Sequence, residues 1–229
     1  MPAAGSGQRF GPQLPKQYMP LAGRTVIECA LGPFLADARC VQLVVALAAG
    51  DARFAALPVA QEPRLHTVTG GARRSDSVLA ALDTVAAAQD EWVLVHDAAR
   101  PCVTRAEIDA LLDAAGADGA SGDAAGALLA QPLADTLKLG DALERVLDTP
   151  PRGALWRAQT PQAFQLGSLR EALRAAHAAR RTPTDEAQAM EWQGQRPRLV
   201  RGSALNLKIT EPTDLALAAM ILAQRGERA

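Results

Sequence analysis

Short apolar runs alternate with alanine- and leucine-rich stretches of helical spacing along most of this chain. Thr104 and Glu107, three residues apart, form a capping-box pattern that starts one of the helices. The expected strands are 41–47, 65–69, 92–96 and 127–130, and the expected helices are 75–88, 105–115 and 166–180. Strands that alternate with helices favour parallel pairing through right-handed crossovers, so we predict an α/β fold built as a three-layer sandwich around a mostly parallel sheet.

The stretch from about 132 to 160 breaks this rhythm. Apolar residues flank a Gly140-Asp141 turn, which predicts an antiparallel hairpin that projects from the main body. A short exposed hairpin is marginally stable alone, so we expect it to pack on a second subunit. Further along, we expect a helix that starts at 184–186 with Thr184 as its N-cap, a short strand at Asn206–Thr210 and a helix from Glu211. The low-complexity stretch 114–127 is interpreted as a surface loop.

Composition narrows the classes of protein. The chain has 229 residues, 48% of them hydrophobic, and a formal net charge of −1, which fits a soluble globular protein and argues against nucleic-acid coating or membrane-surface binding. No apolar run approaches the ~20 residues of a membrane span, and the amino terminus lacks signal-peptide features, so we expect a cytoplasmic protein. The cysteines (Cys29, Cys40 and Cys102) are widely spaced, which predicts free thiols rather than a disulfide framework or a zinc site.

The first candidate for chemistry is the small, glycine-rich loop that opens the chain, followed by Arg9 and Lys16. Glycine lets backbone N–H groups approach phosphates closely, and the two cations can add fixed positive charge. The loop lacks the Walker lysine and the third glycine of the dinucleotide fingerprint, and a merely flexible turn is the alternative. Lysine is scarce: of the 24 basic residues, only three are lysines, namely Lys16, Lys138 and Lys208.

Two further segments place polar groups where ligands bind. Asp97 and Arg100 follow the 92–96 strand, and ligands of such sheets bind beyond the carboxyl ends of the strands. Asp97 suits a substrate hydroxyl or a metal-bound water and Arg100 a phosphate, although an ion pair closing a turn is the alternative; His96 is interpreted as structural. The glycine turn and hydroxyl-rich helix start at 70–77 suit a polar or anionic ligand, or equally an ordinary N-cap.

Taken together, these segments resemble the 2-C-methyl-D-erythritol 4-phosphate cytidylyltransferases of non-mevalonate isoprenoid precursor biosynthesis. The resemblance is carried, in order along the chain, by AAGSGQRF, PKQY, GGARRSDSV, VHDAARP, DTLK, AQTPQAF, TDEA and NLKITEPTDLALA. It implies a single Rossmann-like nucleotidyltransferase domain over 1–229, with a β-arm at about 132–160 and a homodimer in which the arms interlock.

The resemblance also implies roles for individual residues. Four cations are implied to be catalytic: Arg9 and Lys16 by stabilising charge on the reacting triphosphate, Arg152 by reaching the neighbouring subunit's site, and Lys208 by positioning the acceptor phosphate. Residues implied around CTP are Ala3, Ala4, Gly5, Gly71 and Ser77. Residues implied to shape the methylerythritol phosphate pocket are Asp97, Arg100, Thr136, Thr160 and Thr184. A divalent metal, usually Mg²⁺, is implied to accompany CTP, with no residue implied as a dedicated metal ligand.

Three alternatives stay open at this point. One is a cytidylyltransferase for another polyol phosphate such as ribitol 5-phosphate, and another is a nucleotide-binding scaffold without turnover. A glycosyltransferase of similar fold would be expected to carry an Asp-x-Asp metal motif at a strand end, which the sequence lacks. In the family the loop follows an apolar strand, whereas here Met1-Pro2 precede it, so we expect a start upstream of Met1 or a trimmed chain, which the intact mass of the native protein would test.

Overall fold

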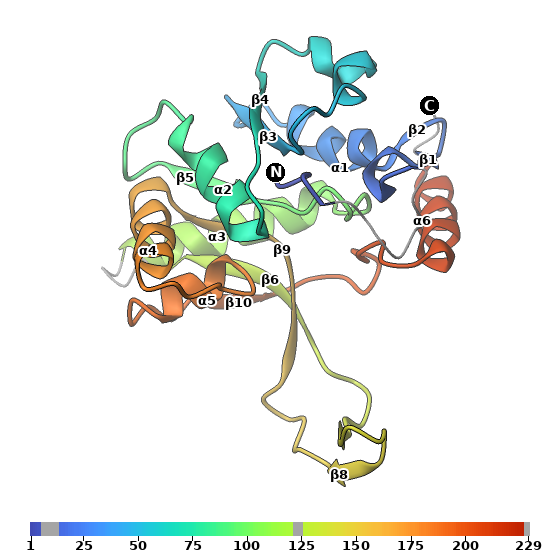
Figure 1. Cartoon of the computed structure of the whole chain (residues 1–229), viewed down its shortest axis with the longest axis vertical. Coiled ribbons are helices and arrows are strands. Elements are labelled where there is room, and N and C mark those ends of the chain that lie inside the picture. Colours follow the sequence, from blue (N-terminus) through green and yellow to red (C-terminus); the bar gives the residue numbers. More distant parts are fainter. Residues whose placement is uncertain (6–13, 121–125, 227–229) are drawn as a thin grey trace.

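The computed structural model describes residues 1–5, 14–120 and 126–226, and Figure 1 shows a layered body from which one long arm projects. The strands are β1 (Pro20–Leu21), β2 (Arg24–Thr25), β3 (Leu43–Leu47), β4 (Leu65–Thr69), β5 (Trp92–Val95), β6 (Ala127–Pro132), β7 (Leu139–Gly140), β8 (Val146–Asp148), β9 (Trp156–Gln165) and β10 (Arg198–Arg201). The helices are α1 (Val26–Leu35), α2 (Arg74–Asp83), α3 (Arg105–Ala120), α4 (Leu166–Ala178), α5 (Glu186–Glu191) and α6 (Pro212–Gln224), with 3-10 turns at Lys16–Tyr18, Phe54–Ala56 and Pro58–Gln61.

The centre of the body is a four-stranded sheet with the order β10-β6-β9-β5. β10 runs parallel to β6, whereas β9 runs antiparallel to both β6 and β5, so the sheet is mixed. Consecutive residues of β6 face opposite sides of the sheet. Leu129 packs in the cluster that holds Ile108 and Leu111 of α3, and Leu128 packs in the cluster that holds Leu169 of α4. Helices therefore cover both faces, which confirms the α/β class.

Most predicted elements are present, and the differences have local causes. Thr104 and Glu107 form the expected capping box, with Thr104 N–H donating to Glu107 Oε2 at 2.9 Å. The prediction of a surface loop from 114 was wrong up to residue 120, because α3 continues through this alanine-rich stretch, and 121–125 lie outside the described residues. Asn206–Thr210 is not a strand: it is irregular backbone, held by Ile209 N–H donating to the Ala99 carbonyl at 2.8 Å.

β3 and β4 form a separate parallel pair, and Met1–Ala3 lie along the edge of β3 that faces away from β4. Pro2 bridges Ala46, and the Ala3 N–H donates to the Ala46 carbonyl at 2.8 Å, so the opening residues run alongside β3 toward its carboxyl end. Between β3 and β5 lies a cavity of about 640 Å³, lined by residues of both strands. The short paired segment brings Ala3–Gly5 to the edge where parallel α/β sheets bind ligands.

The arm grows directly out of the central sheet. β6 and β9 continue past the body, pairing Gln131 with Arg157 and Pro132 with Trp156, and the smaller β7–β8 pair lies beyond them. Figure 1 shows this arm standing clear of the rest of the protein, as predicted for a projecting hairpin. Its apolar side chains are uncovered in the single chain: Leu143 is 70% exposed and Leu147 is 64% exposed.

The cysteines and the lengths of the helices can be compared with the expectations from composition. Cys29 and Cys102 are buried and Cys40 is half-buried, and all three are free thiols, as predicted. Among the described residues, no helix is both long and apolar enough to cross a membrane.

Candidate active site

A buried group of charges lies just after β5, centred on Asp97. Asp97 Oδ1 accepts from Nε of Arg74 at 2.9 Å, and Asp97 Oδ2 accepts from Nζ of Lys208 at 2.7 Å, with Arg100 Nε 4.0 Å away. Burial alone would raise the pKa of the Asp97 carboxyl, but Arg74, Lys208 and Arg100 hold that pKa well below its ordinary value. The structure therefore brings Asp97, Arg100 and Lys208 together.

Thr160 and His96 form a hydrogen-bonded chain that ends at the backbone of Asp97. The Thr160 hydroxyl accepts from the Asp97 N–H at 3.0 Å and lies 3.0 Å from His96 Nδ1. His96 Nε2 lies 3.0 Å from the Arg100 carbonyl, which can only accept, so Nε2 carries the proton and Nδ1 accepts from Thr160. The Thr160 hydroxyl thus fixes the backbone of Asp97, and His96 has the structural role expected of it.

This arrangement predicts how stability depends on pH. Burial lowers the pKa of His96 from 6.5 to about 4, so between those two values the unfolded chain binds a proton that the folded chain does not. Stability should fall as the pH falls through this window, by up to about 3 kcal/mol from this residue, and the effect should vanish above the upper value. Urea unfolding at about pH 7 and about pH 5 should show a smaller loss in His96→Gln than in the wild type. Equal losses would contradict the assignment.

Arg100 holds the segment that carries Lys208. Its Nη1 donates to the Asn206 carbonyl at 2.7 Å, and Asn206 Nδ2 donates in turn to the Thr160 carbonyl at 2.9 Å. Buried backbone carbonyls need such donors, which explains why an irregular segment stays fixed beside the sheet. The Arg100 Nε has no hydrogen-bond partner among the described groups. A role of Arg100 in contacting substrate stays a prediction.

Described residues that the resemblance places around CTP lie near the carboxyl ends of β3 and β4. Gln17 is buried, and its Nε2 donates to the Ala3 carbonyl at 2.9 Å and the Gly5 carbonyl at 3.3 Å, which braces the start of the glycine-rich loop. The Gly71 N–H donates to the Ser77 hydroxyl at 3.1 Å. A side chain at Gly70 would lie only 2.8 Å from the Ala4 Cβ, so the two loops touch.

Lys16 links the beginning of the chain to the segment that carries Lys208. Its Nζ donates to the carbonyl of Ile209, the residue after Lys208, at 2.8 Å. This contact joins residues 193 positions apart.

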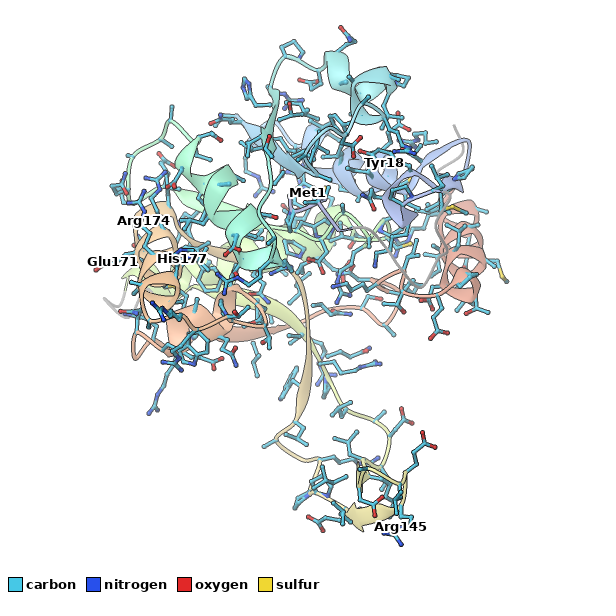
Figure 2. All side chains as sticks on the ribbon, viewed as in Figure 1. Met1, Tyr18, Arg145, Glu171, Arg174 and His177 are labelled. Atoms are coloured by element: carbon cyan, nitrogen blue, oxygen red, sulfur yellow. The ribbon has the colours of Figure 1, made fainter. Side chains whose placement is uncertain are left out.

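Other predicted site residues lie elsewhere or outside the described residues. Thr136 and Arg152 are exposed on the arm, where the Arg152 guanidinium donates to the Ala134 carbonyl. Figure 2 shows the arm's side chains, with Arg145 at the far tip, well separated from the body. Thr184 is exposed and is not the N-cap expected of it, because Asp185 caps α5 by accepting from Gln188 N–H at 2.9 Å. Arg9 lies outside the described residues.

Sequence reasoning missed Arg74 and Glu186 as parts of the charge cluster. Arg74 Nη1 donates to Glu186 Oε1 at 2.6 Å, and Glu186 is 1% exposed. A buried glutamate with helical neighbours gives little signal in a sequence, because glutamate at a helix start is ordinary. The paired arginines at 73–74 were a weak signal of this cluster, since Arg74 contacts the buried carboxylates whereas Arg73 pairs with Asp76.

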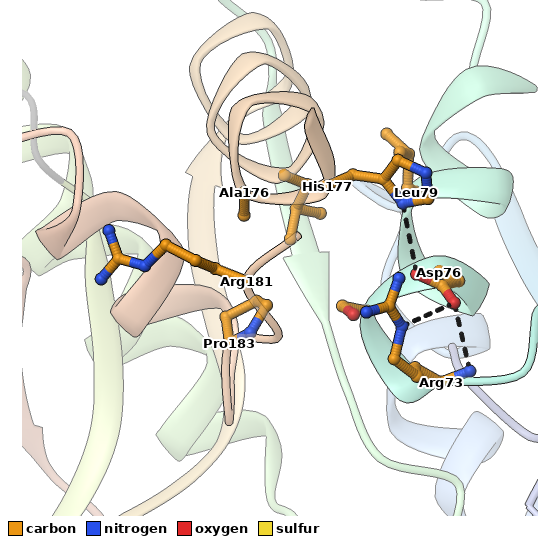
Figure 3. Close-up of a pocket in the computed structure, with 9 residues that line it drawn as sticks. Arg73, Asp76, Leu79, Ala176, His177, Arg181 and Pro183 are labelled. Carbon is orange, nitrogen blue, oxygen red and sulfur yellow. Dashed lines mark hydrogen bonds and ion pairs between the residues drawn. The ribbon is translucent and has the colours of Figure 1, made fainter. Parts of the chain in front are cut away.

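The outward-turning Arg73 lines a separate, shallow pocket between α2 and α4. Arg73 Nε and His177 Nδ1 both approach the Asp76 carboxylate, at 3.0 and 3.7 Å, as Figure 3 shows. The pocket encloses only about 10 Å³, roughly the space of one water. It is too small to be a substrate site.

Comparison with known proteins finds relatives that match nearly the whole chain. Residues 1–224 match the family profile described as 2-C-methyl-D-erythritol 4-phosphate cytidylyltransferase. The enzyme of that name from Vibrio cholerae is 49% identical over 229 residues, which is 100% of this chain and 97% of that protein. A solved structure of a 4-diphosphocytidyl-2C-methyl-D-erythritol synthase superposes with a TM-score of 0.82 at 34% identity, covering 96% of this chain and 95% of that one. The Thermus thermophilus cytidylyltransferase gives a TM-score of 0.78 at 34% identity, with 96% of each chain covered. The chain belongs to the 2-C-methyl-D-erythritol 4-phosphate cytidylyltransferase family.

Proposed function

We propose that this chain joins CTP and 2-C-methyl-D-erythritol 4-phosphate, giving 4-diphosphocytidyl-2-C-methyl-D-erythritol and pyrophosphate, at the edge where Lys16, Lys208 and Asp97 meet. The observation that carries the proposal is the contact of Lys16 Nζ with the Ile209 carbonyl, which brings one lysine to the segment that carries the other, Lys208, from the opposite end of the chain. Such a pair suits a reaction in which two phosphorylated reactants must approach each other.

The chemistry needs charge neutralisation more than proton transfer. An oxygen of the acceptor phosphate attacks the α-phosphorus of CTP in line, forming one P–O bond, and the α-phosphorus bond to the bridging oxygen breaks, with that electron pair leaving on pyrophosphate. The acceptor phosphate is already largely ionised, so no general base is required. In this proposal Arg9 and Lys16 face the triphosphate, and Lys208 positions the acceptor phosphate beside Asp97, Arg100 and Thr160.

The nucleotide is assigned to the loops on the other side of Lys16. Ala3, Ala4, Gly5 and Gly71 offer backbone groups at the ends of β3 and β4, and Ser77 fixes the 70–71 turn through its hydroxyl. Small residues there let a ring or a phosphate approach the backbone closely.

The described residues do not form a resident Mg²⁺ site. Within them no three carboxylates, histidines or cysteines cluster at metal-binding distance, and both oxygens of Asp97 contact cations. Mg²⁺ commonly binds through substrate phosphates and retains several waters. We therefore assign any Mg²⁺ to the triphosphate, as part of the substrate, and derive the steps above from the chain's own side chains.

We further propose that two copies associate through the arm. Four apolar side chains on it, Leu139, Leu143, Val146 and Leu147, are each more than half exposed in the single chain. Exposed apolar side chains in a cluster favour an interface. A second copy would also bring Arg152 and Thr136, which the arm holds far from the site of their own chain, toward the site of the partner. The cytoplasmic location predicted from the sequence stays a prediction.

The acceptor is the feature that a direct assay tests. With CTP and a panel of sugar and polyol phosphates, pyrophosphate release should be fastest with 2-C-methyl-D-erythritol 4-phosphate, by at least about tenfold in kcat/KM over ribitol 5-phosphate. A preference for ribitol 5-phosphate would contradict the proposed acceptor. Binding of CTP without pyrophosphate release from any acceptor would instead indicate a scaffold that has kept the fold without turnover.

A further inference from the structure

Arg74, the first residue of α2, joins two buried carboxylates that come from distant parts of the chain. Its Nε donates to Asp97 Oδ1 at 2.9 Å, and its Nη1 and Nη2 donate to Glu186 Oε1 and Oε2 at 2.6 and 3.0 Å. Asp97 follows β5, and Glu186 begins α5. A planar guanidinium suits this place because it presents several donors in fixed directions, which a lysine ammonium does not.

The charges of the group depend on one another. Burial raises the pKa of Glu186, and Arg74 opposes that rise. Burial also disfavours the charged form of Arg74, but Glu186 and Asp97 together raise its pKa above its ordinary value. Without Arg74, two buried carboxylates would face each other, and without Glu186 the guanidinium would lose the group that fixes its far end.

The two carboxylate oxygens of Asp97 contact different partners. Oδ1 contacts Arg74, and Oδ2 contacts Lys208 Nζ at 2.7 Å. The direction in which Oδ2 presents itself to Lys208 is therefore set by what holds Oδ1 in place.

Resting on the function proposed above, we propose that Arg74 and Glu186 are positioning residues for the acceptor: Glu186 fixes the Arg74 guanidinium, which in turn holds Asp97 so that Asp97 places Lys208. Neither residue contacts the reacting atoms in this account. Their effect reaches the reaction only through Asp97 and Lys208.

The neighbouring arginine separates this role from a general effect on α2. Arg73 has different partners: its Nε donates to Asp76 Oδ2 at 3.0 Å and its Nη1 donates to Thr182 Oγ1 at 2.8 Å. Both arginines follow Gly71, which is assigned to the nucleotide. A loss that came from disturbing this turn would raise the KM for CTP, whereas a loss through Asp97 would fall on the acceptor.

The test compares Arg74→Lys and Glu186→Gln with Arg73→Lys as the matched control, after the wild type has been shown to release pyrophosphate from CTP and 2-C-methyl-D-erythritol 4-phosphate. In both test variants we expect kcat/KM for the acceptor to fall by at least roughly tenfold, with the KM for CTP within about threefold of the wild type. Arg73→Lys should keep both constants near the wild-type values. A wild type without activity would contradict the proposed function itself, a result distinct from any result with the variants.

A double variant, Arg74→Met with Glu186→Gln, guards against simple unfolding. It removes both charges of the pair, and exchanging a buried ion pair for uncharged groups often restores stability. We expect its thermal midpoint to recover relative to Arg74→Met alone while the acceptor kcat/KM stays low, because nothing then holds Asp97 Oδ1. Recovery of activity along with stability, or wild-type acceptor kinetics in either folded single variant, would overturn the proposal.

Discussion

Replacing Lys16 by alanine is expected to lower kcat by roughly a hundredfold or more while leaving the fold intact. The ammonium group lies 2.8 Å from the Ile209 carbonyl, beside Lys208, so the variant removes positive charge from the place where the two phosphorylated reactants are proposed to meet. Its neighbours Gln17 and Tyr18, which are the buried residues of this turn, stay in place. Arg9→Ala is expected to have a comparable effect.

The measurement is the steady-state rate of pyrophosphate release at saturating CTP and 2-C-methyl-D-erythritol 4-phosphate. Lys138→Ala is the matched control, because this lysine lies on the arm and its Nζ donates to Thr149 Oγ1 at 2.8 Å. Lys16→Arg keeps the charge but changes its shape, so we expect an intermediate rate. A Lys16→Ala enzyme that keeps most of its kcat would contradict the role given to this residue.

The strands and helices that were easiest to predict are those whose burial is uniform or periodic. The 41–47 and 92–96 runs contain β3 and β5, because continuous apolar residues leave few alternatives to a buried strand. The β4 strand was also predicted at its observed bounds, 65–69, although its LHTVT sequence is mixed and most of its residues are not buried. β9 and β10 were missed. The polar β9 sequence around Gln159 and Gln162 hides a strand whose glutamines are buried and satisfied partly by tertiary contacts, such as Gln162 Oε1 accepting from the Ala187 N–H at 2.9 Å.

Some residues of the candidate site could likewise be predicted from the sequence, and others could not. Asp97 and Lys208 were named as candidates because the resemblance gives their motif positions a role, and the structure joins them at 2.7 Å. Arg74 and Glu186 also lie in motifs of the resemblance, GGARRSDSV and TDEA, but their partnership spans 112 positions and neither motif has a pattern specific to an ion pair. The prediction of Thr184 as a helix cap failed for a smaller reason: the next residue, Asp185, is an equally good cap, and only the backbone decides between them.

Arg152 is the opposite case, a residue to which the resemblance gives a catalytic role but which lies far from the site of its own chain. It is exposed on the arm, bonded to the Ala134 carbonyl, and the arm leaves the body altogether. If it acts on the reacting phosphates, it must do so in a partner subunit. Arg152→Ala should then lower kcat by roughly a hundredfold, as expected for loss of a cation that stabilises developing charge. Arg145→Ala, at the tip of the same arm, should have little effect, because its guanidinium pairs with Asp141 of its own arm at 2.8 Å.

Mixed dimers test whether Arg152 crosses the subunit boundary. Pairing an Arg152→Ala chain with a Lys16→Ala chain gives one site with both defects and one with neither, provided that Arg152 serves the partner's site. Random exchange of two inactive homodimers should then restore about a quarter of the wild-type rate, since half of the dimers are mixed and each has one intact site. If Arg152 served its own chain, every site in the mixed dimer would carry one defect, and the mixture would stay as inactive as its parents. A mixture without recovered activity, in which mass spectrometry confirms mixed dimers, would contradict the proposed arm exchange.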